Sequence, residues 1–153
     1  VGSAAIVSDA AVVAAIDEVK YETIEGLSYM ASYVPQQDAA IPVIFREDPA
    51  DGRNDNSGIN IGNLNPDADI TVTIDLVTTT GQSLLPVPLS VTVPKGGNTF
   101  VYVPFIDGVP PGSVTAARLR TESASGFVAI SNDINYAVAG DGSVVFAATG
   151  MRG

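Results

Sequence analysis

The sequence predicts an all-β protein: an antiparallel β-sandwich of immunoglobulin-like or jelly-roll-like kind, with an N-terminal β-strand extension. β-Branched and aromatic residues recur with a period of two from residue 41 onward, and turn residues interrupt them about every 8–14 positions. No helical stretch lies between the apolar runs, which favours an antiparallel sandwich over an α/β sheet. The 153 residues suffice for one domain with a core, which we place at 39–153.

The expected strands follow one another between turn signals rich in Gly, Pro, Asn and Asp. The alternation is strictest where Ile70, Val72, Ile74 and Leu76 share one face and threonines occupy the other. One face of that strand is therefore expected to be buried and the other wet. The expected strands are 41–46, 58–63, 70–78, 89–93, 99–104, 113–122, 126–136 and 142–148. The expected core residues include Ile61, Ile70, Val72, Ile74, Phe100, Tyr102, Val128, Ile130 and Ile134.

The N-terminal region resembles the C-terminal region of the same chain. Residues 13–21 lie opposite 128–136 at an offset of 115, and 26–31 lie opposite 142–147 at an offset of 116. Residues 1–33 then look like the last three strands of a sandwich whose earlier strands are missing. For this reason we expect 9–20 to form a strand, although its alanines would tolerate a helix.

Strands without the rest of their sheet have open edges that must be covered. Residues 1–33 can fold onto the chain's own domain, or they can complete another copy of the protein by strand addition. We expect the second arrangement, with 1–38 as strand extension and linker and with copies of the chain as the partner. The connecting stretch 32–38 is then expected to cross between subunits. The expected interface residues are Val12, Val13, Ile16, Val19, Tyr21 and Tyr29.

Composition narrows the chemistry. Seven Lys and Arg against 17 Asp and Glu give a net charge of -10, which disfavours nucleic acid as a partner. The absence of His and Cys removes the usual general base and the thiolate nucleophile, and Asp17 and Glu18 are adjacent in a strand and so point to opposite faces. We therefore expect no enzyme activity and no cofactor. No apolar run is long enough for a membrane span.

Two polar stretches carry weaker expectations. The oxygens of Asp51, Asn54, Asp55 and Asn56 are of the kind that calcium prefers, but their spacing differs from the EF-hand loop, so a solvated turn is the competing interpretation. Thr78, Thr79 and Thr80 precede a glycine and are candidate acceptors for an O-glycan. Threonine is equally an ordinary residue of edge strands.

Several motifs together resemble a β-sandwich repeat of secreted and cell-surface bacterial proteins. In that repeat, an apolar strand is followed by a Gly-bearing turn, a strand ending in Asn-Leu, an alternating Thr/Val strand, a Pro-Gly turn and an aromatic strand. The matching segments are 40–46, 56–64, 70–74, 94–97 and 100–104, and the tail around 111–113 and 140–142 is similar as well. The resemblance implies an extracellular structural or adhesive role. The layout of the chain also resembles pilus-like subunits that polymerise through an N-terminal extension.

Three functions are therefore open. The first is a structural subunit of an extracellular helical filament, which polymerises head-to-tail through the N-terminal strands. The second is one module of a tandem-repeat cell-surface or adhesive protein, and the third is a carbohydrate-binding accessory module. We expect the chain, which begins at Val1, to be a processed or excised product located outside the cell or at its surface.

Overall fold

The computed structural model describes residues 4, 6–20, 25–30, 34–47, 55–135, 144–147 and 149–150, with the backbone alone for 18–20, 25–30, 144–147 and 149–150. In these segments the protein is all-β: every element is a strand except one 3₁₀ turn, η1 (Val103–Phe105). All strand pairs are antiparallel. No helix in this part of the chain has the length and apolar character that a membrane span requires.

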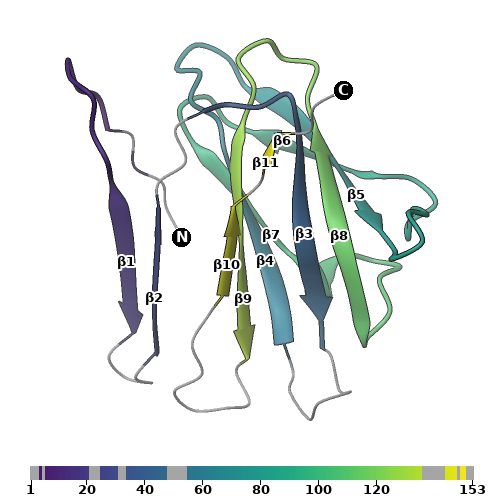
Figure 1. Cartoon of the computed structure of the whole chain (residues 1–153). Helices are drawn as coiled ribbons and strands as arrows, with labels where there is room; N and C mark the ends of the chain where they lie inside the picture. Colours follow the sequence, from purple (N-terminus) through teal and green to yellow (C-terminus); the bar gives the residue numbers. More distant parts are fainter. Residues whose placement is uncertain are drawn as a thin grey trace.

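Nine strands form one curled sheet, a half-barrel (Figure 1). Along its main path the order is β10-β9-β4-β3-β8-β5-β6, while β7 pairs with β4 and β11 pairs with β3. The strands are β3 (Asp38–Arg46), β4 (Asp55–Gly62), β5 (Ile70–Val77), β6 (Leu89–Val93), β7 (Asn98–Tyr102), β8 (Ser113–Arg120), β9 (Val128–Asn135), β10 (Val144–Ala147) and β11 (Thr149–Gly150). The eight strands expected from residue 41 onward are confirmed, and β6 has the expected bounds.

The curl of the sheet originates at β4. Strand β9 pairs with one edge of β4 from Asp55 to Gly62, so β7 and β3 share the other edge: β7 pairs with Gly58–Gly62, and β3 pairs at Asn56 alone. The wall β9-β4-β7 therefore folds over the wall β3-β8-β5-β6. Strands β6 and β7 are consecutive in the chain, yet no ladder joins them. The half-barrel is open between these two strands.

The core fills the space between the two walls. The alternation expected for β5 is confirmed, because Ile70, Val72, Ile74 and Leu76 are buried while Thr71 and Thr73 are exposed. The opposite wall contributes residues of β4, β7 and β9 and of the turn before β9. These are Ile59, Ile61, Val101, Phe127 and Ala129.

Five expected core residues lie outside the core. Phe100 is 44% exposed, and Tyr102, Ile130 and Ile134 are half-buried. In an antiparallel sheet, residues directly opposite each other share a face, and Asn60 is opposite both Phe100 and Ile130. These side chains are on the outer face of β4-β7-β9, while the smaller Val101 and Ala129 face the core. Val128 is half-buried and lies opposite Gly62 on the same outer face.

The end of the linker is attached to the chain's own domain. Gln36 and Phe127 exchange two backbone hydrogen bonds, of 2.8 and 2.9 Å, and the N–H of Thr121 donates to the carbonyl of Gln37. Asp38 forms an ion pair with Arg120 at 2.8 Å. We expected the stretch 32–38 to cross between subunits. Because 36–38 are bound to the domain, a crossing must lie before Gln36.

The N-terminal strands form a separate two-stranded hairpin. β1 (Ala15–Lys20) pairs with β2 (Glu25–Met30), and neither strand pairs with the nine-stranded sheet (Figure 1). The expectation of a strand rather than a helix is confirmed for Ala15–Lys20, whereas 9–14 have no regular structure. Three strands were expected before residue 34, and the described residues there contain two.

Candidate functional site

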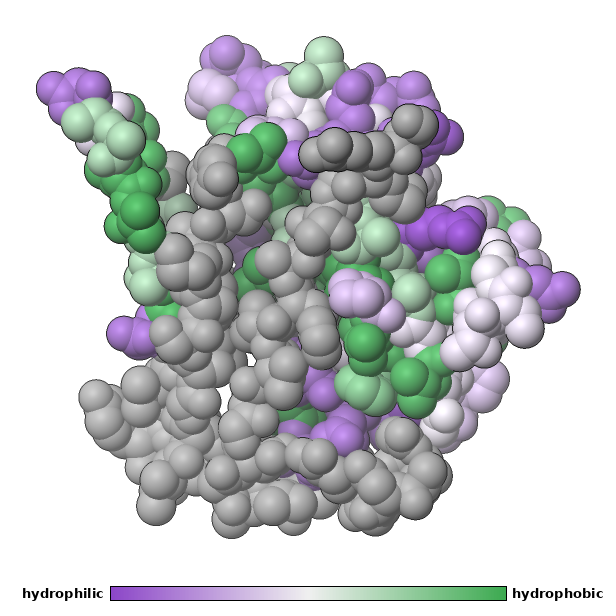
Figure 2. Space-filling view, viewed as in Figure 1, coloured by the Kyte–Doolittle hydropathy of each residue, from purple (hydrophilic) through white to green (hydrophobic). Residues whose placement is uncertain are grey.

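Among the residues that the structure describes, two apolar surfaces lack cover, and the first is the N-terminal segment. Val13 is 85% exposed and Val12 58% exposed, and Ile16, on β1, is also exposed. Ile6 and Val7 extend this apolar surface toward the chain's beginning. In Figure 2 hydrophobic residues follow this projecting segment, which stands away from the body of the molecule. A monomer seldom leaves so many large aliphatic side chains in water within one short segment.

The hairpin of this segment has the same register as the hairpin β9-β10. Asp17 pairs with Ser28 in the first, and Asp133 pairs with Val144 in the second. Both residues of the second pair are 116 positions further along the chain than those of the first. This is the offset of the second sequence block, which contains most of β2 and all of β10, and it differs by one residue from the offset of 115 of the first block, which contains β1 and β9. The two hairpins differ in their further pairing: β9 pairs with β4 along eight residues, whereas within the described segments β1 pairs with β2 alone.

The second uncovered surface is the groove at the opening of the half-barrel, here called the β6–β7 groove. One side is formed by residues 85–91, and the other by 99–102 with 105–107. Its floor continues over the outer face of β4 and β9, and the side chains of Ile16 and Asp17 reach its rim. The groove has a volume of about 1390 Å³, above the roughly 300–1,000 Å³ of a typical small-molecule pocket. A segment of polypeptide fits a groove of this size.

The groove exposes part of the core. Leu89, Val91 and Val93 of β6 lie opposite Ile74, Val72 and Ile70 and so face the same interior. Their β5 partners are all buried, and so is Val93, which is next to the turn. Leu89 and Val91 are only half-buried. The inward side chains of β6 are therefore less buried with increasing distance from the turn, toward the mouth of the groove.

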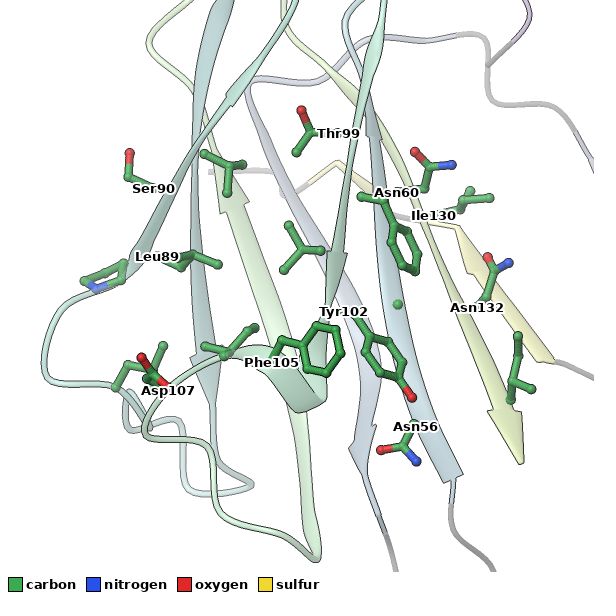
Figure 3. A pocket seen from close by; sticks show the side chains of 18 of the residues that line it. Asn56, Asn60, Leu89, Ser90, Thr99, Tyr102, Phe105, Asp107, Ile130 and Asn132 are labelled. Atoms are coloured by element: carbon green, nitrogen blue, oxygen red, sulfur yellow. The ribbon is translucent and has the colours of Figure 1, made fainter. Parts of the chain in front are cut away.

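Three aromatic rings line the groove. Phe100 and Tyr102 stack with ring centroids 6.4 Å apart, and Tyr102 contacts Phe105 edge-on at 5.1 Å. Figure 3 shows Tyr102 and Phe105 side by side, across the groove from Leu89 and Ser90 of β6. Phe105 is 84% exposed although it is a large apolar side chain. Phe100 and Tyr102 are two positions apart on β7 and so share one face of that strand.

Three asparagines contribute to the polar lining. Asn60 Oδ1 accepts a hydrogen bond from Asn98 Nδ2 at 2.8 Å, and Asn56 Oδ1 accepts one from the N–H of Glu47 at 3.1 Å. Asn132 lies nearby on β9 (Figure 3). The charged residues among the lining are Asp17 and Asp107. Both are acidic, so the described lining carries no positive side chain.

The residues expected to bind calcium do not form one described cluster. Asp51 and Asn54 lie outside the described residues. Asp55 and Asn56 belong to β4 rather than to a loop, and as neighbours in a strand they point to opposite faces of the sheet. The described segments contain no group of three or more acidic side chains placed to hold a metal. Calcium binding at the four residues stays a prediction.

The threonines expected to carry a glycan lie in the turn after β5. Thr79 and Thr80 are exposed, Thr78 is half-buried, and the hydroxyls of Thr78 and Thr80 are 2.9 Å apart. Their accessibility is compatible with modification. Whether a glycan is attached stays a prediction.

The expected interface residues are described in part. Val12, Val13 and Ile16 are exposed, the side chains of Val19 and Tyr29 are not described, and Tyr21 lies outside the described residues. Sequence reasoning did not identify the β6–β7 groove. A signal was present in 85–89, where two prolines separate three aliphatic residues, since a proline-rich apolar stretch is a poor candidate for a buried strand.

Comparisons with protein-family models, with curated proteins and with solved structures found no match for this chain.

Proposed function

We propose that the chain is a structural subunit of an extracellular helical filament that polymerises head-to-tail through its N-terminal strands. The observation that supports this most directly is that, within the described residues, the hairpin β1-β2 pairs with no strand of the nine-stranded sheet. Val12 and Val13, which precede the hairpin, and Ile16 of β1 are exposed. Full burial of each such side chain is worth about 1.5–3 kcal/mol before the cost of association. A second copy can supply that burial.

The attachment of the linker supports a head-to-tail contact. Gln36 is bound to its own domain, so the segment before it projects from a defined point of each subunit. A donor segment at one place and an acceptor at another make a heterologous contact, which extends into a helical filament when it does not close into a ring. The extracellular location rests on the resemblance to repeats of secreted and cell-surface proteins.

The two walls of the half-barrel suggest a finer description of the fold. We propose that β9-β4-β7 and β3-β8-β5-β6 correspond to the two layers of a β-sandwich, with the core between them. In this description the sandwich is open between β6 and β7.

One observation favours the second function, a module of a tandem-repeat surface protein. The hairpins β1-β2 and β9-β10 match the internal sequence repeat to within one residue, as two successive repeats of one fold would. Both functions need strands to pass from one unit to the next, and they differ in whether a covalent chain joins the units. Electron microscopy of the purified 153-residue chain separates them: filaments support the proposed function, and dispersed single particles contradict it.

A further inference from the structure

We propose that the β6–β7 groove is the acceptor for the N-terminal segment of a second copy of this chain. The inference rests on the proposed function and adds the place at which the donated segment binds. It is drawn from the incomplete core, the free strand edges, the distribution of apolar surface and the distribution of charge.

The core lacks cover on one side. Along β6 the inward side chains change from buried at Val93 to half-buried at Val91 and Leu89, while the inward side chains of the neighbouring strand β5 are all buried. Protein interiors are close-packed, and half-covered aliphatic side chains at the end of a wall indicate that a layer is missing there. An additional strand between β6 and β7 would cover them.

The groove also offers backbone hydrogen bonds. Within the described part of the chain, β6 pairs only with β5, and β7 pairs only with β4. The link between the two strands is the hydrogen bond from Thr99 Oγ1 to the carbonyl of Thr92, near the turn. Beyond that point each strand has a free edge whose N–H and C=O groups can pair with an entering strand.

The exposed large apolar residues concentrate on the donor and acceptor surfaces. Of eleven such residues in the described chain, five are in the N-terminal segment and three are in the groove. The five are Ile6, Val7, Val12, Val13 and Ile16, and the three are Val87, Phe100 and Phe105. If the segment of one copy binds the groove of the next, a single contact covers both surfaces.

Charge is compatible with this occupant. Residues 10–16 contain no charged side chain, and the lining of the groove includes only two carboxylates. Two copies that each carry a charge of -10 repel one another, so their contact is least costly where both surfaces are uncharged. An uncharged strand adds no further negative charge to a groove whose only charged lining residues in the described chain are these two carboxylates.

The occupant comes from a second copy rather than from the same chain. Ile16 and Asp17 of the chain's own hairpin reach the rim of the groove, yet Val12 and Val13 stay exposed. The chain's own segment thus leaves the floor of the groove open. In a polymer, the segment of the preceding subunit would lie there.

Cysteine cross-linking tests the location directly, because the chain has no cysteine of its own. Val13→Cys is made in one preparation, and Val87→Cys or Phe105→Cys in another that carries a mass tag. The preparations are mixed during assembly and treated with a short bis-maleimide. Leu64→Cys serves as the matched acceptor control, because Leu64 is an exposed aliphatic residue outside the groove. We expect the hetero-cross-link to form at least tenfold more with the groove cysteines than with Cys at position 64.

The outcomes separate the two proposals. If assemblies sediment but cross-linking is equal at the groove and at position 64, the acceptor is elsewhere and the filament proposal stands. If neither assemblies nor cross-links form, the filament proposal itself fails. The variant Phe105→Asp tests a different occupant of the groove. If this variant assembles as the parent chain does but no longer binds a panel of soluble oligosaccharides, the groove binds a glycan. The strand-acceptor proposal is then wrong.

Discussion

The ring of Phe100 lies directly over Gly58 on the neighbouring strand. A Cβ placed on Gly58 would overlap that ring, so only glycine lets the ring lie against the sheet. Gly58 pairs with Tyr102, whose ring stacks on Phe100. The glycine thereby shapes the floor of the β6–β7 groove, and this suggests a first prediction.

Gly58→Ala should displace the ring of Phe100 and weaken self-assembly while leaving the fold intact. Loss of the aromatic contact costs about 0.5–1.5 kcal/mol, and replacing glycine in a strand returns about 0.5–1 kcal/mol, so the stability of the monomer should change by less than about 1 kcal/mol. Chemical denaturation and sedimentation measure the two effects. Gly62→Ala, on the same strand but outside the groove, should assemble normally. Equal assembly by both variants would show that the floor of the β6–β7 groove does not contribute to the subunit contact.

Val13→Asp should abolish polymerisation without lowering the melting temperature. The side chain is 85% exposed, so the folded monomer loses nothing, whereas a buried carboxylate in a subunit contact is costly. Light scattering monitors assembly, and calorimetry monitors stability. The control is Leu64→Asp, an exposed leucine outside both surfaces. Polymers of normal length from Val13→Asp would exclude this residue from the contact.

A chain that lacks residues 1–33 should stay a folded monomer. The backbone pairs of Gln36 with Phe127 and the ion pair of Asp38 with Arg120 are retained, so the domain keeps its attachment to the linker. Circular dichroism should show an unchanged β spectrum, and ultracentrifugation should show a single monomeric species. Long assemblies of the shortened chain would show that the N-terminal strands are dispensable.

Gly126→Ala should destabilise the domain more than Gly81→Ala. Both glycines have a positive φ, of 66° and 79°, which penalises any side chain. A Cβ at Gly126 would also lie 2.9 Å from the carbonyl oxygen of Gln36, whereas nothing lies within 4 Å of a Cβ at Gly81. We expect about 1 kcal/mol for Gly81→Ala and about 2–3 kcal/mol for Gly126→Ala in urea denaturation. Equal losses would contradict the tight packing of the linker on the domain.

The sequence predicts the strands well and the faces less well. In β5 one face is apolar and the other polar, so the period of two identifies both the strand and its buried side. In β7 and β9 both faces carry apolar residues; the sequence predicts Phe100 and Ile130 to face the core, whereas Val101 and Ala129 do so in the structure. The period of two locates such a strand but does not show which of its two faces is buried.

The groove depends on a relationship that no local pattern contains. The turn at 94–97 marks β6 and β7 as neighbours, and neighbours joined by a short turn usually pair. Here β7 pairs with β4 instead, because β9 and β3 leave the segment from Gly58 to Gly62 of β4 free on that side. The opening between β6 and β7 follows from that long-range pairing, which the sequence does not reveal.

Mixing two inactive variants tests head-to-tail assembly most directly. Val13→Asp has a damaged donor segment and an intact groove, and Phe105→Asp has an intact donor and a damaged groove. Each alone should be monomeric by ultracentrifugation. An equimolar mixture should form a one-to-one heterodimer and no larger species, because only one functional joint is available. If the mixture stays monomeric, or if it forms long polymers, donation of the N-terminal segment into the β6–β7 groove is wrong.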